Sequence, residues 1–161
     1  MPWRVVSKAE ENAKAFNCAV NILSFKRRSI KEVISKLKQK GYENKSIEYA
    51  ISKLSEYKYV DDYAFAKAFI KDRQCFKKSG KGLIKQELFR KGVDKEIVEQ
   101  LLIENVDEQD EYQRALELAK KKARSFSSGD TRNTKYRKLM GLLSRKGFSF
   151  DIISAVMKEV A

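Results

Sequence analysis

One short pattern occurs three times in this chain, and it constrains the fold more than any other feature of the sequence. In each copy a leucine stands four residues before a glycine, a lysine stands one residue before it, and an apolar residue follows it. The glycines, Gly41, Gly92 and Gly147, lie 51 and then 55 positions apart. A period of this size predicts tandem copies of one supersecondary unit.

Each copy of the pattern lies between stretches of helical periodicity. Apolar residues spaced three and four apart precede the glycine, as Ile30, Val33 and Leu37 do in the first copy. A glycine that follows a basic last turn is expected just beyond a helix end, where it adopts a left-handed conformation easily and the cations face the negative end of the helix dipole. A shorter apolar run after the glycine, residues 47–54 in the first copy, predicts the next helix.

With one longer helix before each pair, the sequence predicts nine helices in three units. The predicted fold class is all-α, with three tandem three-helix repeats that form an elongated, curved helical array. The expected repeats are residues 1–58, which include a short N-terminal extension, residues 59–105 and residues 106–161. Each unit is too small to bury its apolar stripe alone, so neighbouring units are expected to touch.

Polar residues mark the expected helix starts. Capping-box patterns begin at Ser7 and Ser29, and Asn44 is expected to cap the third helix. Asp61 and Asp62 form the one suggestive pair of carboxylates. Because adjacent residues on a helix point about 100° apart, we interpret them as capping residues and not as a catalytic dyad.

Positive charge is concentrated in phase with the repeat. The formal net charge is +13, and residues 26–40, 71–91 and 120–147 carry net charges of +6, +6 and +9, whereas residues 92–119 carry −7. One basic block is usually a solvated face, but three blocks at equivalent places favour a polyanion or an acidic protein surface as partner. The expected contact residues are the basic side chains near the helix connections: Arg27, Arg28, Lys31, Lys77, Lys78, Lys81, Lys85, Arg90, Lys91, Arg132, Arg137, Lys138 and Arg145.

Several function classes are disfavoured by composition. The chain has no histidine and only two cysteines, Cys18 and Cys75, which cannot supply the four ligands of a structural zinc site. The basic connection at residues 77–82 lacks the spacing of a phosphate-binding loop. No apolar run approaches the ~20 residues of a membrane span. We therefore expect a cytoplasmic protein that is not an enzyme and that has no metal site.

An aromatic-rich helical face follows Asp62. It carries Tyr63, Phe65 and Phe69. We interpret these aromatic residues as core packing rather than as a base-stacking surface.

The order and spacing of these features resemble the RecX family, bacterial regulators of the RecA recombinase. The resemblance runs from about residue 9 to residue 160. The segments that carry it are Arg28-Ser29, Tyr59-Val60-Asp61-Asp62, Phe65-Ala66, Phe69-Ile70, Arg73, Lys78, Gly80, Leu83-Ile84, Gln86-Glu87-Leu88, Lys91-Gly92-Val93, Arg145-Lys146-Gly147-Phe148-Ser149 and Asp151-Ile152. One departure is Lys58, where the family usually has a glycine, and it leads us to expect a differently shaped turn.

The resemblance implies a protein that binds in the helical groove of a RecA–single-stranded DNA filament. Such binding blocks filament extension and suppresses strand exchange and coprotease activity, in DNA repair and the SOS response. It also implies no catalysis and no cofactor. We expect weaker binding to free single- and double-stranded DNA, no membrane association, and a monomer.

Two other functions are consistent with the residues alone. The basic blocks would also suit a general DNA- or RNA-binding helical protein, whose affinity for naked nucleic acid falls steeply with salt. A helical-repeat scaffold for another acidic protein is the third reading.

Overall fold

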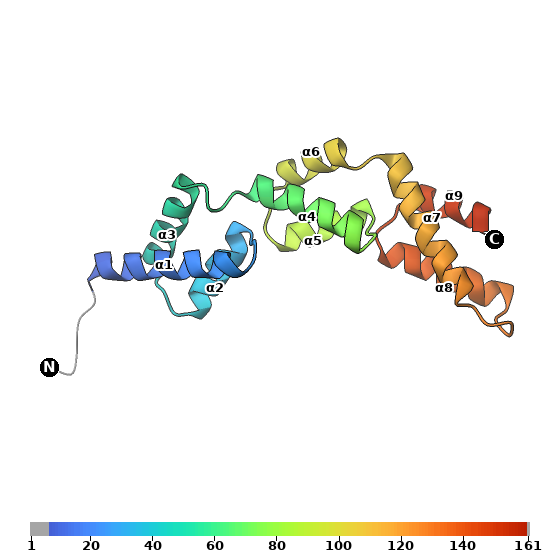
Figure 1. Cartoon of the computed structure of the whole chain (residues 1–161), viewed down its shortest axis with the longest axis horizontal. Helices are drawn as coiled ribbons and strands as arrows, with labels where there is room; N and C mark the ends of the chain where they lie inside the picture. Colours follow the sequence, from blue (N-terminus) through green and yellow to red (C-terminus); the bar gives the residue numbers. More distant parts are fainter. Residues whose placement is uncertain (1–6, 161) are drawn as a thin grey trace. The chain divides into compact units, whose positions relative to one another are not determined.

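The computed structural model describes residues 7–160, which form nine α-helices and no β-strand (Figure 1). The all-α prediction and the number of helices are confirmed; the expected N-terminal extension lies outside the described residues. None of these helices combines the length and the apolar character needed to cross a bilayer. The helices are α1 (Lys8–Phe25), α2 (Ile30–Gln39), α3 (Asn44–Glu56), α4 (Asp62–Phe76), α5 (Lys81–Arg90), α6 (Lys95–Asn105), α7 (Glu108–Arg124), α8 (Arg132–Arg145) and α9 (Phe150–Val160).

The chain divides into two compact units. The first comprises the chain up to Phe65 together with Lys91–Val93, and the second comprises Ala66–Arg90 and the chain from Asp94 on. In the first unit α1 packs against α3 and α2 (Figure 1). In the second unit α7 packs against α9 and α8, and α5 packs against α6. The division into three repeats at residues 1–58, 59–105 and 106–161 stays a prediction.

The repeated leucines are core residues. Leu37, Leu88 and Leu143 are each 0% exposed. In the first unit Leu37 lies in a cluster with Val33 and Leu54 that is formed by α1, α2 and α3. Full burial of one such side chain stabilises the fold by about 1.5–3 kcal/mol. In the second unit Leu143 lies in a cluster with Leu139 and Val156. Leu37 and Leu143 therefore anchor α2 and α8 to their cores.

The repeated glycines end their helices as predicted. Gly41, Gly92 and Gly147 have φ of 91°, 80° and 87°. In the first and third copies the glycine N–H donates to the carbonyl three residues back at 3.0 Å, and the next N–H donates to the carbonyl of the repeated leucine at 3.2 Å. This pair of bonds is the Schellman arrangement, which satisfies carbonyls that a helix end leaves open.

A lysine adopts the same conformation at the end of α3. Lys58 has φ 58°, and its N–H donates to the Ser55 carbonyl at 3.1 Å while the Tyr59 N–H donates to the Leu54 carbonyl at 2.8 Å. Lys58 thus takes the conformation expected of a glycine, and the differently shaped turn that we expected is not found. The left-handed region costs a residue with a Cβ roughly 1–2 kcal/mol.

The helix starts agree with the sequence at three of four places. Ser7 accepts from the Glu10 N–H at 3.2 Å, and Ser29 forms the expected reciprocal capping box. The Asp61 carboxylate caps its own helix by accepting from the N–H groups of residues 63 and 64 at 2.9 and 3.3 Å. The prediction for Asn44 is wrong, because α3 already includes Asn44 and the cap position falls on the preceding residue, which makes no side-chain cap bond.

Candidate functional site

A strongly basic concavity lies between α7 and α8. It is a groove of about 400 Å³ lined by Lys122, Thr134, Arg137, Lys138 and Arg145, which we call the third-repeat groove. Three of these residues are among the predicted contact residues. Lys122 was missed, because only the packing of α7 on α8 brings its side chain to the predicted cations.

Most of the charge of the third-repeat groove is not neutralised internally. Lys138 pairs with Asp130, with Nζ and Oδ1 3.5 Å apart. The Ser127 N–H, together with the charge of Lys138, lowers the pKa of Asp130, so this carboxylate stays ionised at neutral pH. No ion pair within residues 7–160 joins the other three cations of the groove to a carboxylate. The groove therefore suits an anionic ligand such as the phosphates of a nucleic acid.

A glycine inside α8 makes room for one of these cations. A Cβ at Gly141 would lie 3.0 Å from Nη1 of Arg145. The guanidinium of Arg145 therefore lies close against the surface of α8. A glycine in a helix interior costs about 1 kcal/mol relative to alanine, and an alanine here would bring its Cβ against the Arg145 guanidinium.

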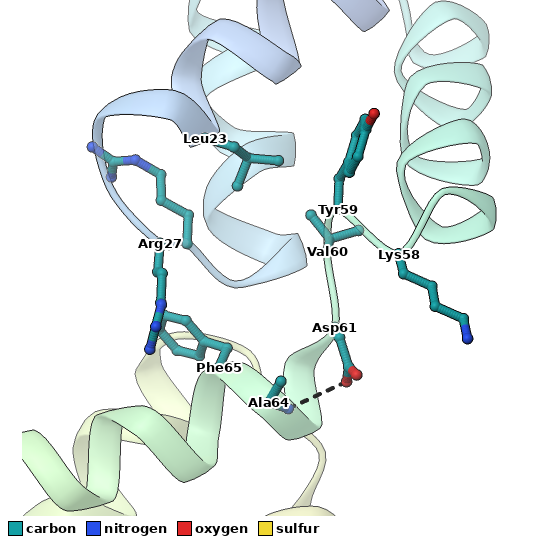
Figure 2. A pocket seen from close by; sticks show the side chains of 9 residues that line it. Leu23, Arg27, Lys58, Tyr59, Val60, Asp61, Ala64 and Phe65 are labelled. Carbon is teal, nitrogen blue, oxygen red and sulfur yellow. Dashed lines mark hydrogen bonds between the residues drawn. The ribbon is translucent and has the colours of Figure 1, made fainter.

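A second concavity, which we call the first-unit cleft, lies where α1 ends and α4 begins. It has a volume of about 340 Å³. Figure 2 shows Leu23 reaching into it from α1 and Val60 from the segment that enters α4. The cleft combines apolar and cationic side chains, and two of its residues belong to the predicted contact set. Its lining residues are Leu23, Arg27, Arg28, Lys58, Tyr59, Val60, Asp61, Ala64 and Phe65.

One arginine of the first-unit cleft belongs to an internal charge cluster. Glu32 lies 3.7 Å from Arg28 Nη1 and 3.3 Å from Lys91 Nζ. Although partial burial raises the pKa of Glu32, the Ser29 N–H, Lys91 and Arg28 together hold it below its usual value. Arg28 and Lys91 are therefore committed in part to this carboxylate and are less available to a partner.

Two predicted contact residues of the second unit are also paired. Lys78 Nζ lies 3.4 Å from Glu117, and Lys85 Nζ lies 3.7 Å from Glu99. The latter ammonium also lies 5.8 Å from the centre of the Phe89 ring. Surface pairs of this kind contribute about 0–1 kcal/mol, so they mainly reduce the charge offered to a ligand.

The other predicted contact residues are exposed, and one of them, Arg27, lines the first-unit cleft. Within the described part of the chain they have no ion pair. Their role in partner binding stays a prediction. They are Arg27, Lys31, Lys77, Lys81, Arg90 and Arg132.

The glycine turns also take part in contacts between segments of successive repeats. In the first unit the Ser29 hydroxyl donates to the carbonyl of Lys91, the residue before Gly92, at 2.6 Å. The Ile30 N–H at the start of α2 donates to Asp62 Oδ1 at 3.0 Å. Asp62 was predicted to cap a helix, and it does, but the helix belongs to the preceding repeat. We call this arrangement the first joint.

The second unit contains an equivalent arrangement, the second joint. The Gly80 N–H donates to the carbonyl of Lys146, the residue before Gly147, at 2.7 Å. The Lys81 N–H at the start of α5 donates to Glu111 Oε1 at 2.6 Å. Glu111 is only 5% exposed, and this bond satisfies its buried carboxylate. Sequence reasoning did not identify Glu111 because it looks like one member of an ordinary acidic first turn.

The second joint also explains the glycines in the connection at residues 77–82. A Cβ at Gly80 would lie 2.7 Å from the carbonyl carbon of Gly147, and the Gly82 N–H donates to the Gly147 carbonyl at 2.9 Å. These glycines therefore allow two backbone segments to approach closely.

The aromatic face of α4 is only partly core. Tyr63 is 39% exposed, so the prediction of core packing is wrong for it. Phe65 and Phe69 are half-buried, and the Arg73 guanidinium carbon lies 4.6 Å from the centre of the Phe69 ring. The core positions of this helix are taken by Ala66 and Ile70.

No cluster of three or more potential metal ligands occurs among residues 7–160. Cys18 and Cys75 are both free thiols.

Three family models match the chain in consecutive order. They describe the first, second and third three-helix domains of RecX, and they match residues 15–54, 61–102 and 108–157. The chain belongs to the RecX family.

Relatives and solved structures agree with this assignment. A protein named Regulatory protein RecX from Clostridium botulinum (strain Eklund 17B / Type B) is 34% identical over 97% of this chain and 73% of its own length. The RecX protein of Bacillus subtilis (strain 168) is 32% identical over 96% of this chain and 58% of its own length. The crystal structure of RecX from Lactobacillus salivarius superposes with a TM-score of 0.81 at 31% identity, covering 94% of this chain and 97% of that one. A second RecX crystal structure, 22% identical, shares the fold with a TM-score of 0.83 over 98% of this chain and 81% of that one.

Proposed function

We propose that this chain is a negative regulator of the RecA recombinase that binds the groove of the RecA–single-stranded DNA filament. Binding there inhibits filament extension, strand exchange and coprotease activity, in DNA repair and the SOS response. The observation that carries the proposal is the consecutive match to all three RecX three-helix domains. The third-repeat groove supports it, since a protein lying along a nucleoprotein filament meets phosphates.

The proposal is tested by DNA-dependent ATP hydrolysis of preformed RecA filaments. Substoichiometric amounts of the purified protein should lower the rate progressively, because a protein that stops filament extension leads to net loss of RecA from the DNA. An unchanged rate at equimolar protein and modest salt would refute the proposal.

A general nucleic-acid-binding protein is the second candidate, and the unpaired cations of the third-repeat groove favour it. The test replaces Lys122, Arg137 and Arg145 by glutamine. Each phosphate neutralised on a single strand contributes roughly 0.7 to the slope of log affinity against log salt, so the triple variant should lower that slope by about 2. Under this candidate, inhibition of RecA would need no filament-specific binding and would disappear at the salt concentration that abolishes binding to naked DNA.

A matched control keeps the loss of charge constant. In the control, three lysines that lie outside the third-repeat groove and outside the predicted contact set are replaced by glutamine, and the slope should change by less than one third as much. An equal change in both variants would mean that overall charge, and not the third-repeat groove, determines binding. The control lysines are Lys45, Lys53 and Lys95.

The remaining properties follow from the same proposal. We propose a cytoplasmic monomer that acts through binding, without catalysis or a cofactor, and that holds free single- and double-stranded DNA more weakly than the filament. The elongated, curved array of repeats stays a prediction.

A further inference from the structure

The first and second joints are built from the same components at equivalent positions. In each, a Lys-Gly pair at a helix end offers the lysine carbonyl to the start of the middle helix of the preceding repeat. In each, a carboxylate from the first helix of the later repeat accepts the first N–H of that same middle helix. The later repeat thus supplies two acceptors and a glycine, and the earlier repeat supplies a helix N-terminus.

The first repeat carries the same kinds of residue. Glu11 is the fourth residue of α1, as Glu111 is of α7. Glu11 stands 30 residues before Gly41, as Asp62 does before Gly92, whereas Glu111 stands 36 residues before Gly147. In both joints, the start of a helix from the preceding repeat contacts the lysine carbonyl. No repeat precedes α1 within residues 7–160, so the described chain has no such helix start for Lys40. The Tyr42 hydroxyl, next to Gly41, donates to the carbonyl of Lys14 at 3.4 Å, and Lys14 lies one helical turn from Glu11 on α1.

The turn at Gly41 differs from the other two in having open space beside it. A Cβ at Gly92 would meet the side chain of Lys31 at 2.5 Å, and one at Gly147 would meet Leu83 Cβ at 2.5 Å. At Gly41, apart from the glycine itself and its two chain neighbours, no atom of the described residues lies within 4 Å of the Cβ position. The left-handed glycine turn is therefore covered by neighbouring side chains in both joints, whereas at Gly41 it is open.

We propose that Glu11, Lys40 and Gly41 form an open half-joint that binds the N-terminus of an α-helix of a protein partner. The partner helix begins with a serine or glycine cap, which donates to the Lys40 carbonyl as Ser29 and Gly80 donate in the two joints. Its first-turn N–H donates to Glu11, which also faces the positive end of the helix dipole.

The chemistry of the partner is specified further by the first joint. Lys91 reaches a carboxylate in the first turn of the helix that it contacts, with Nζ and Glu32 Oε2 3.3 Å apart. Lys40 holds the equivalent position, so a partner helix with a carboxylate in its first turn complements its charge. Because Gly41 has no side chain, the partner backbone or an aliphatic stem can lie directly against the turn. This interaction surface goes beyond the proposed function and does not depend on it.

The test uses the full chain, labelled with nitrogen-15, and a synthetic helical peptide with the sequence of residues 27–39. That peptide begins α2 and contains the Ser29 cap and Glu32. At about 5 mM peptide, within the range of effective concentration that a short linker provides, we expect saturable amide shifts at Glu11, Lys40 and Gly41. A peptide with Ser29→Val and Glu32→Lys should produce none. Absence of shifts at the half-joint, or equal shifts with the control peptide, would overturn the proposal.

A charge swap identifies the contact that carries the binding. The Lys40→Glu chain should bind the natural peptide at least tenfold more weakly and should recover affinity with the Glu32→Lys peptide. Lys38→Glu, with the same charge change at an exposed position two residues away, should alter affinity less than threefold. Failure of the swap to restore binding, or an equal loss in Lys38→Glu, would contradict the half-joint.

Sedimentation velocity of the chain alone identifies one source of the partner helix. Self-association that Lys40→Glu abolishes would support the half-joint and assign the helix to a second copy. Self-association that is insensitive to Lys40→Glu while the peptide also fails to shift Gly41 would overturn it. None of these readouts involves RecA, so a failure of the proposed regulatory function would be recognised separately.

Discussion

Replacing two of the repeated glycines by alanine separates the role of the turn from the role of the joint. Gly41 and Gly147 have nearly the same φ, 91° and 87°. Alanine in this region costs about 1–2 kcal/mol at either position, because its Cβ crowds the backbone. The two positions differ in their surroundings, since the Cβ of residue 147 would overlap Leu83 whereas that of residue 41 would meet open space.

The hydrogen bonds of the second joint determine how much more Gly147→Ala should destabilise the protein than Gly41→Ala. To admit a Cβ at residue 147, the turn must move away from the start of α5 and lose two hydrogen bonds, Gly80 N–H to Lys146 O and Gly82 N–H to Gly147 O, of 2.7 and 2.9 Å. Each such bond contributes about 1 kcal/mol to the free energy of unfolding. We therefore expect Gly147→Ala to destabilise the protein by about 2 kcal/mol more than Gly41→Ala, which corresponds to a factor of roughly 30 in the folding equilibrium.

Urea unfolding followed by far-ultraviolet circular dichroism measures both variants. Native-state amide exchange then reports where stability is lost, and in Gly147→Ala the amides of Gly80 and Gly82 should exchange faster while those of α1 stay protected. Equal destabilisation by the two substitutions would refute the reasoning, because it would mean that only the left-handed conformation matters.

Three further outcomes are expected. Lys58→Gly should raise the free energy of unfolding by about 1 kcal/mol, measured by urea unfolding, because it relieves a left-handed lysine; a loss of stability would contradict this. The pKa of Glu32 is lower in the folded state than its ordinary value of 4.5, so its stabilising effect is present above pH 4.5 and is lost as pH falls through the lower folded value. Glu32→Gln should therefore reduce the loss of stability at acid pH in a stability–pH profile. An unchanged profile would mean that Glu32 does not contribute to acid unfolding. Gly141→Ala should stabilise α8 by up to about 1 kcal/mol. It should also weaken binding of a fluorescent single-stranded DNA severalfold, because the new Cβ displaces the Arg145 guanidinium. Unchanged binding would mean that this guanidinium does not contact the DNA.

The helices and their ends were predictable from local patterns. Spacing of three and four placed Val33 and Leu37 on a buried face, and the glycine after each leucine stopped its helix because no other residue adopts a positive φ so easily. These are interactions within a few residues of the chain, so the identity of neighbouring residues is enough to predict them. The error at Asn44 is a shift of one position, which is the scale at which helix caps are hard to assign.

The contacts between distant segments depended on the tertiary structure. Nothing in the acidic run around Glu111 distinguishes the one carboxylate that caps α5, and nothing in a basic block shows that Lys85 is paired whereas Arg137 is not. These differences arise because hydrogen bonds and ion pairs act over about 3–4 Å, so they depend on which helix faces lie together. Composition and periodicity thus determined the helical repeats and their charge. Packing alone decided which charges remain available to a partner. It also decided that Gly92 and Gly147 are covered by neighbouring side chains whereas Gly41 is open.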